Sequence, residues 1–275
     1  MARVIAIANQ KGGVGKTTTA VNLAASLATA EKRVLLVDID PQGNASSGLG
    51  FARGNRSEGS IYDVLMGELT LEATIRKTEL PHLDLVPANS DLAGGEIELV
   101  PLAAREMRLR LPLDAIRDDY DFIFIDTPPS LGLLTLNALC AADGVLVPLQ
   151  CEYYALEGLS DLRSTVELVG QSLNPGLGID GIVLCMVDNR QNLTEQVASE
   201  VRSHFGDKVY STTIPRNVRL SEAPSFGKPA LLYDVSSKGA RSYLDLAREF
   251  LVRQSPRRTA LGEAGGRTPP GLSRP

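Results

Sequence analysis

The sequence predicts one α/β domain in which helices cover both faces of a mostly parallel, twisted sheet. Short apolar runs alternate with longer helical segments, the order that parallel strands and their crossover helices require. Several of these runs lack the polar alternation of a half-exposed strand, as expected for strands buried on both faces. The 275 residues, 43% of them hydrophobic, are enough for one sizeable core.

The predicted elements follow one another along most of the chain. We expect strands at residues 4–8, 33–38, 83–87, 120–126, 145–149, 179–187 and 208–215. Helices are expected at residues 18–30, 60–66, 92–99, 103–117, 156–173, 194–204 and 237–253. Residues 1–253 therefore form the domain. Residues 254–275 are rich in Pro, Gly, Arg and Ser and have little to bury, so we expect a disordered tail.

Charge is distributed unevenly along the chain. The formal net charge is -5. Residues 1–189 carry 14 Lys and Arg against 25 Asp and Glu, whereas residues 190–275 carry 14 against 8. A basic final third on an acidic protein suggests a polyanionic partner, although part of this excess lies in the tail.

Targeting and cysteine patterns favour a cytoplasmic protein. No apolar run approaches the roughly 18 residues of a membrane span. The N-terminus enters the first strand after one charged residue, Arg3, so we expect no signal peptide. Cys140, Cys151 and Cys185 are widely spaced beside apolar stretches, which favours small core residues in a reducing compartment. The two isolated histidines do not suggest a zinc site.

A glycine-rich loop at residues 11–18, Lys-Gly-Gly-Val-Gly-Lys-Thr-Thr, joins the first strand to the first helix. Its glycines let successive backbone N–H groups face a polyphosphate, and the helix N-terminus adds partial positive charge. Lys16 can reach the β- and γ-phosphates, and the Thr17 hydroxyl can ligate Mg²⁺. The fold prediction therefore becomes a P-loop NTPase-like domain. The nucleotide-binding residues are Lys11, Gly12, Gly13, Val14, Gly15, Lys16, Thr17 and Thr18.

Acidic residues close two of the predicted strands. Asp38 and Asp40 follow the second strand, and Asp126 ends the strand at 120–126. Ligands of open parallel sheets bind at this carboxyl edge. An aspartate that closes a hydrophobic strand beside a phosphate loop is the Walker B arrangement, in which the acid holds Mg²⁺ or its water shell. Asp126 is therefore expected at the metal.

Four segments together carry a family resemblance over about residues 2–252. The phosphate loop resembles the deviant Walker A box of the ParA/MinD ATPases: Gln10 stands where the standard pattern has glycine, and Lys11 is an extra lysine. Residues 38–44 look like switch I of the ParA family, and Asp-Thr-Pro-Pro at 126–129 resembles switch II. Residues 214–224, Ile-Pro-Arg-Asn-Val-Arg-Leu-Ser-Glu-Ala-Pro, resemble the chromosomal ParA/Soj branch.

The resemblance implies ATP and Mg²⁺ as cofactors and assigns roles to the loop acids. Asp40 would position or activate the attacking water beside the metal, and Asp38 would support Mg²⁺ through water or hold the loop. Lys11 would act catalytically by reaching the nucleotide of a second subunit. Glu152 is a weaker candidate near the dimer interface. A structural role remains open for Asp38, Asp40 and Glu152, the two aspartates as helix caps or turn residues.

The same resemblance assigns binding residues in the basic final third. Pro215 and Asn217 would lie by the adenine. Arg190 and Arg219 would contact DNA phosphates, without base specificity and with strong salt dependence. Surface ion pairs remain the alternative reading of both arginines. Weaker candidates for DNA are Lys228, Lys238 and Arg241.

The function implied is that of an ATP-dependent homodimer that binds DNA non-specifically and hydrolyses ATP weakly unless a partner stimulates it. With a ParB-like centromere-binding partner it would segregate chromosomal or plasmid DNA in the cytoplasm, at the nucleoid and away from membranes. A MinD-like spatial regulator is an alternative, but residues 254–275 lack its amphipathic helix. An iron-protein-like carrier would need a cysteine pair. A nucleotide-gated cargo adaptor without turnover also remains open, although Asp40 argues against it.

Overall fold

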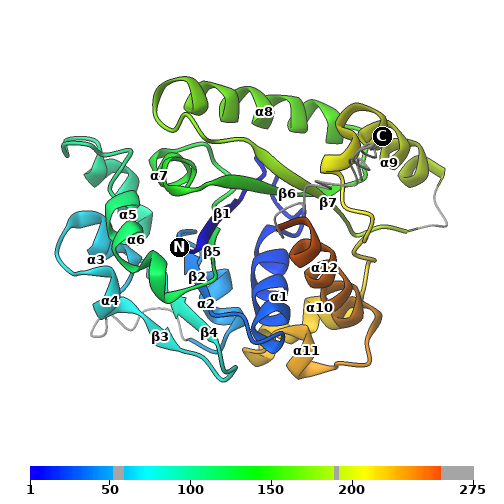
Figure 1. The fold of residues 1–275 in the computed structure, drawn as a ribbon, viewed down its shortest axis with the longest axis horizontal. Helices are drawn as coiled ribbons and strands as arrows, with labels where there is room; N and C mark the ends of the chain where they lie inside the picture. The colour runs from blue at the N-terminus through cyan, green and yellow to red at the C-terminus, as the bar shows by residue number, and fades with distance from the viewer. Residues whose placement is uncertain (52–58, 189–191, 255–275) are drawn as a thin grey trace, which may run out of the picture.

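A seven-stranded sheet runs through the centre of the computed structural model, which describes residues 1–51, 59–188 and 192–254 (Figure 1). The strand order is β3-β4-β2-β5-β1-β6-β7, and β3 is the antiparallel edge strand of an otherwise parallel sheet. The strands are β1 Arg3–Ile7, β2 Val34–Asp38, β3 Arg76–Lys77, β4 Leu83–Val86, β5 Phe122–Asp126, β6 Gly144–Gln150 and β7 Ile179–Cys185. The predicted α/β fold is confirmed.

Helices lie against both faces of this sheet (Figure 1). The α-helices are α1 Lys16–Thr29, α2 Asn44–Gly48, α3 Ile61–Met66, α4 Leu71–Thr74, α5 Leu92–Leu99, α6 Arg110–Ile116, α7 Leu133–Ala141, α8 Ala155–Ser172, α9 Asn192–Phe205, α10 Val218–Glu222, α11 Ala230–Tyr233 and α12 Lys238–Gln254. Short 3₁₀ turns are η2 Arg117–Asp119, η3 Gly206–Lys208 and η4 Ala223–Phe226. Within the described ranges no helix combines the length and apolarity needed to cross a membrane.

The central strand β1 shows how the sequence builds two cores. Val4 and Ala6 pack into the layer with α7 and α8, whereas Ile5 and Ile7 pack into the layer with α1 and α12. Strand side chains alternate between the faces, so only a continuously apolar run can fill both layers. The three cysteines are buried and free, as expected for core residues.

The structure corrects three of the expected elements. Residues 208–215 do not form a strand: Val209 and Pro215 make only isolated bridges. The expected helix at 103–117 begins instead at Arg110, after a run of turns. The antiparallel strand β3 was not anticipated, because two polar residues carry no strand pattern. The last helix includes Gln254, and the rest of the predicted tail lies outside the described residues.

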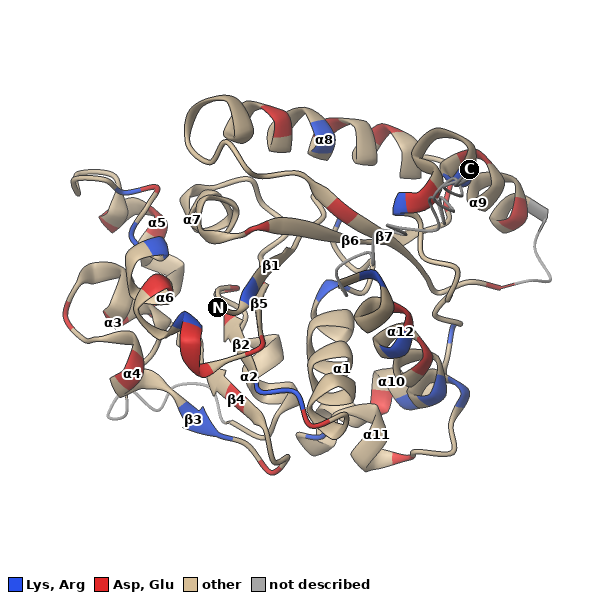
Figure 2. Ribbon diagram, in the orientation of Figure 1, with Lys and Arg blue, Asp and Glu red and all other residues tan. Residues whose placement is uncertain are grey.

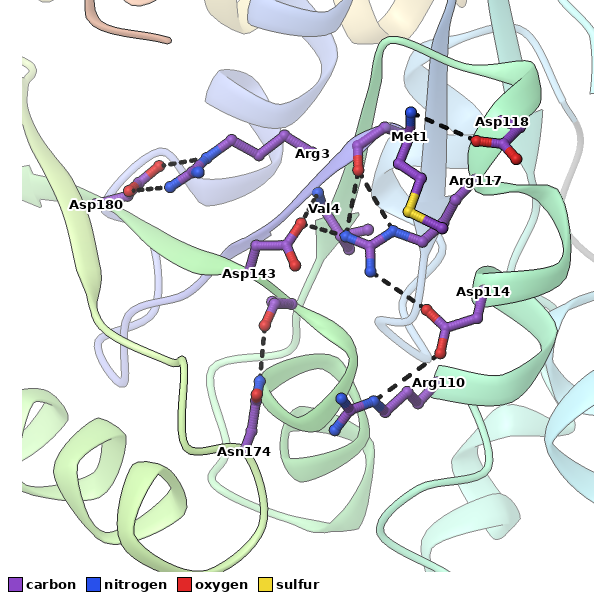
Figure 3. Close-up of polar contacts among 12 residues, drawn as sticks. Met1, Arg3, Val4, Arg110, Asp114, Arg117, Asp118, Asp143, Asn174 and Asp180 are labelled. Atoms are coloured by element: carbon purple, nitrogen blue, oxygen red, sulfur yellow. Dashed lines mark hydrogen bonds and ion pairs between the residues drawn. The ribbon is translucent and has the colours of Figure 1, made fainter. Parts of the chain in front are cut away.

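Ion pairs tie the opposite, amino-terminal edge of the sheet together (Figure 3). The Arg117 guanidinium pairs with Asp143 and also donates to the Ala2 carbonyl at 3.2 Å. Asp143 in turn accepts the backbone N–H of Val4 at 2.8 Å. Arg3 pairs with Asp180 at 2.6 Å. This half-buried network fixes the start of β1 and so sets the position of the loop that follows its other end.

Gly181 in β7 is a position where the fold tolerates only glycine. A Cβ placed there would lie 2.3 Å from Cε2 of Tyr210, a buried ring that the Arg253 guanidinium covers at 3.9 Å from its centroid. We expect Gly181→Ala to lower the free energy of unfolding by about 1–3 kcal/mol, because overpacking displaces this ring. Gly178→Ala is the matched control, since a Cβ at Gly178 meets nothing within 4 Å. Equal midpoints in urea for the two variants would contradict the prediction.

Candidate nucleotide and magnesium site

The loop between β1 and α1 has the shape of an anion cradle. Gly13 and Gly15 take positive φ angles of 75° and 97°, which other residues adopt only with strain. Gly15 is the N-cap of α1, and its carbonyl accepts the N–H of Thr19 at 2.8 Å. The first N–H groups of the 14-residue helix α1 therefore have no partner within the helix and are free to face an anion.

Lys16 lies at the centre of this cradle. The residue is 7% exposed, and its ammonium donates to the carbonyl of Lys11 at 3.1 Å. Burial lowers the pKa of Lys16, and the nearby carboxylates of Asp126 and Asp40 act in the opposite direction. A buried cation beside a ring of backbone donors is the environment that a phosphate group stabilises.

Asp126 is the observation that best supports a metal at this site. It ends β5, it is completely buried, and neither carboxylate oxygen meets a hydrogen-bond partner within the described residues. Burial raises the pKa of Asp126 well above its usual range, and its strand neighbour Asp38 raises it further, while the nearby Thr17 hydroxyl lowers it only in part. An orphaned buried carboxylate is costly, and a bound cation would remove that cost.

The residues present fit Mg²⁺ held together with a nucleotide. Thr17 and Asp126 supply hard oxygen donors, which magnesium prefers, and Asp40 lies near enough to influence both Lys16 and Asp126. In the part of the chain that the structure describes, no group of three or more His, Cys, Asp or Glu side chains could hold a metal. Phosphate oxygens and water would therefore complete the coordination, as is usual for magnesium–nucleotide sites.

Asp38 and Asp40 differ in what they contact. One oxygen of Asp38 accepts both the N–H and the hydroxyl of Ser46 at 2.7 Å, and the other accepts the N–H of Asp40 at 3.2 Å. Burial raises the pKa of Asp38 to about 6. Asp38 thus holds the loop, one of the two roles considered for it. Asp40 is 6% exposed and accepts only the N–H of Gln42 at 2.9 Å, which leaves its other oxygen available.

Lys11 forms an ion pair with Glu152 in the single chain. Both side chains are nearly half exposed, at 45% and 46%. The N–H of Lys11 also donates to Oδ1 of Asn9 at 2.9 Å, and Nδ2 of Asn9 donates to the Pro148 carbonyl in β6 at 2.8 Å. Sequence reasoning did not single out Asn9, although it lies next to the loop and anchors it to β6. The ammonium of Lys11 therefore reaches out of the loop, toward the start of α8.

A cavity of about 530 Å³ extends from the phosphate loop away from Lys11. Thr17 and Thr18 line it at the loop end, and Pro215 and Asn217 line it on the far side, so the structure brings these four predicted residues together. Sequence reasoning missed most of the remaining wall, which includes Asn22, Cys185, Leu220, Ala223, Pro224 and Tyr243. No local pattern marks these residues, because they come from five separate stretches. The cavity is large enough for a nucleoside.

The two DNA candidates differ in what the structure says of them. Arg219 lies on α10 and is paired with Glu222 at 2.7 Å and with Asp234 at 3.4 Å. Arg190 lies outside the described residues. Lys228 pairs with Glu79 at 3.5 Å, and Lys238 and Arg241 are exposed at the start of α12. Figure 2 shows basic residues on α10 and α12 interspersed with acidic ones. The cationic surface is therefore mixed rather than continuous.

Known proteins resemble this chain over most of its length. The family model described as an AAA domain matches residues 2–179. The chromosome partitioning protein ParA of Myxococcus xanthus is 59% identical over 93% of this chain and 90% of the relative. The sporulation initiation inhibitor protein Soj of Bacillus subtilis is 59% identical over 90% of this chain and 98% of the relative.

A solved structure extends the comparison to a bound nucleotide. Cobyrinic acid a,c-diamide synthase from Mycobacterium smegmatis with bound ADP and magnesium superposes with a TM-score of 0.79. It is 39% identical, and the match covers 91% of this chain and 94% of that chain. The fold and the phosphate loop agree with these matches, and sequence identity of 59% is maintained over at least 90% of the chain. The protein therefore belongs to the ParA/Soj family of chromosome-partitioning ATPases.

Proposed function

We propose that the chain binds ATP with Mg²⁺ and hydrolyses it. The observation that carries the proposal is the orphaned carboxylate of Asp126, which faces Lys16 and Thr17 at the mouth of the phosphate loop. Mg²⁺ would bridge phosphate oxygens and neutralise charge there. Lys16 would contact the β- and γ-phosphates, and Asp40 would orient the attacking water with its free oxygen. The adenine would occupy the cavity beside Pro215 and Asn217.

We further propose that ATP binding creates a homodimer in which each Lys11 reaches the partner's nucleotide. Its exposed ammonium supports this role, because it points out of its own loop and is held only by Glu152. The charge that Lys11 brings would add to transition-state stabilisation, as a cationic finger supplied in trans does in other phosphoryl-transfer enzymes. Intrinsic turnover would remain slow until a partner ordered the switch loops.

The dimer would bind duplex DNA non-specifically through its basic C-terminal surfaces and would release it after hydrolysis. Arg219 and Arg190 are the proposed phosphate contacts. Together with a ParB-like centromere-binding protein, such a switch would move or position DNA at the nucleoid in the cytoplasm. The names of the relatives that match 90% or more of this chain support partition over the alternative of a division-site regulator.

Asp40→Asn tests the hydrolytic part of this proposal. The asparagine keeps the acceptor for the Gln42 N–H but cannot take up a proton or attract the water as strongly. We expect ATP binding to persist and the turnover in the presence of DNA and partner to fall by about 10²-fold or more. Asp118→Asn, an exposed aspartate at the opposite edge of the sheet, is the matched control. Wild-type turnover no faster than that of the Asp40 variant would favour a non-hydrolytic adaptor.

A further inference from the structure

Asn217 connects the nucleotide cavity to the helix that carries Arg219. Its side chain lines the cavity, and its Oδ1 caps α10 by accepting the N–H of Arg219 at 3.1 Å. Among the described residues, Nδ2 of Asn217 makes no hydrogen bond. This amide group is therefore able to donate to an acceptor nitrogen of a base while Oδ1 keeps its capping bond.

Helix α10 forms part of the cavity wall and presents its other side to solvent. Leu220 is buried and lines the cavity, whereas Val218 is 68% exposed. Arg219 lies on the exposed side, where its guanidinium pairs with Glu222 three residues later and with Asp234. The position of the Arg219 guanidinium therefore depends on α10 being formed, because the i,i+3 pair exists only in a helix.

A helix of five residues has little stability of its own. Two contacts hold α10 in place: the Asn217 cap at its start and the packing of Leu220 against α12. At the second contact the fit is close, since a Cβ on Gly239 would lie 2.5 Å from Cγ of Leu220 and 3.1 Å from Oδ1 of Asn217. Any ligand that fixes the Asn217 side chain also stabilises the start of α10.

We propose that Asn217 is a positioning residue that couples base occupancy of the cavity to the presentation of Arg219 toward DNA, within each subunit. The inference rests on the proposed ATP-dependent DNA binding and adds a second control to it. Dimerisation would bring two basic surfaces together, and the base, through Asn217 and α10, would orient the arginine on each of them.

Two substitutions at position 217 separate the cap from the base contact. Asn217→Ser keeps a neutral capping oxygen but is too short to reach the base, whereas Asn217→Ala loses both functions. Both variants should bind ATP more weakly than the wild type. The full-length proteins are therefore compared at saturating ATP, with equal dimer fractions verified by sedimentation velocity. Their affinity for a non-specific duplex is then measured at one salt concentration.

We expect Asn217→Ala dimers to bind the duplex about 3–10-fold more weakly than wild-type dimers, and Asn217→Ser dimers to bind it within about 2-fold of them. Gly239→Ala, which displaces Leu220 and touches neither base nor DNA, should weaken DNA binding in the same direction. Unchanged far-UV circular dichroism and melting temperature identify folded variants. Equal DNA affinity of the Ala variant and the wild type would overturn the coupling, as would equal losses in the Ser and Ala variants. Absence of ATP-dependent DNA binding by the wild type would instead overturn the proposed function itself.

Discussion

Asp126→Asn is expected to stabilise the nucleotide-free protein while it abolishes the stabilisation that Mg²⁺-ATP provides. The carboxylate is completely buried without a hydrogen-bond partner among the described residues, and it lies beside Asp38 on the neighbouring strand. A neutral amide of the same shape removes the cost of this uncompensated charge at neutral pH. We expect the free energy of unfolding to rise by about 1–3 kcal/mol. For a chain of this size, each kcal/mol corresponds to about 2–4 °C in Tm.

The loss on the ligand side should be larger. Wild-type protein with Mg²⁺-ATP at 100 times its Kd gains about 2.7 kcal/mol, because ligand binding favours the native state. The variant retains the phosphate loop but lacks the carboxylate proposed for the metal. Adding Mg²⁺ to ATP should therefore give it no further stabilisation. Calorimetry of both proteins with ATP, in EDTA and in Mg²⁺, measures the difference directly.

Asp143→Asn is the matched control, because it makes the same chemical change at the opposite edge of the sheet. Asp143 pairs with Arg117 and accepts the Val4 N–H, so its neutralisation should destabilise the protein by about 1–2 kcal/mol (Figure 3). Its response to Mg²⁺-ATP should equal that of the wild type. A destabilised Asp126 variant that still responds to Mg²⁺ would show that this carboxylate does not hold the metal.

Lys11→Ala is expected to abolish ATP-dependent dimerisation and to lower turnover by about 10²–10³-fold. The reason is the loss of a cation that the proposal places on the partner's phosphates, where a trans cation makes a contribution of this size or more. Lys77→Ala is the control, since Lys77 also pairs with one carboxylate but lies on the edge strand β3. Sedimentation velocity with ATP and a phosphate-release assay give the two readouts. Dimerisation and hydrolysis left intact in the variant would refute the trans role.

Glu152→Gln tests the same role from the other side. The ion pair with Lys11 is nearly half exposed and contributes at most about 1 kcal/mol. Its removal should strengthen ATP-dependent dimerisation by about 2–5-fold, because the lysine no longer has to leave a partner in its own chain. Glu167→Gln, which breaks the exposed Arg163 pair on α8, should have no effect. Weaker dimerisation of the Glu152 variant would mean that Glu152 itself contacts the second subunit.

The elements that the sequence predicted correctly are those whose signal is contiguous. The phosphate loop, the buried strand before it and Asp126 at the end of β5 each lie within a dozen neighbouring residues, and a parallel sheet then places their ends together. The same holds for the cavity residues Pro215 and Asn217, which the family resemblance supplied and the fold brings beside Thr17.

The errors arose where distant contacts override the local pattern. Residues 208–215 have a strand-like composition, but the N–H groups of Ser211 and Thr212 donate to the Glu249 carboxylate of α12 at 2.8 Å instead of to a neighbouring strand. The Lys11–Glu152 pair joins residues 141 positions apart, and no spacing rule predicts it. Such contacts depend on the assembled fold, so a single sequence carries no direct signal of them.

Binding of the full-length protein to a non-specific DNA duplex tests the account most directly. It is measured with ATP, with ADP and without nucleotide, at two salt concentrations, beside Arg219→Ala. Arg248→Ala is the control, since Arg248 is also exposed and paired three residues along its helix. The account predicts binding only with ATP, a logarithmic salt slope reduced by about 0.9 for each phosphate contact that the Arg219 variant loses, and an unchanged control. Absence of DNA binding in every nucleotide state would contradict the account and would direct the search to membranes and protein cargo.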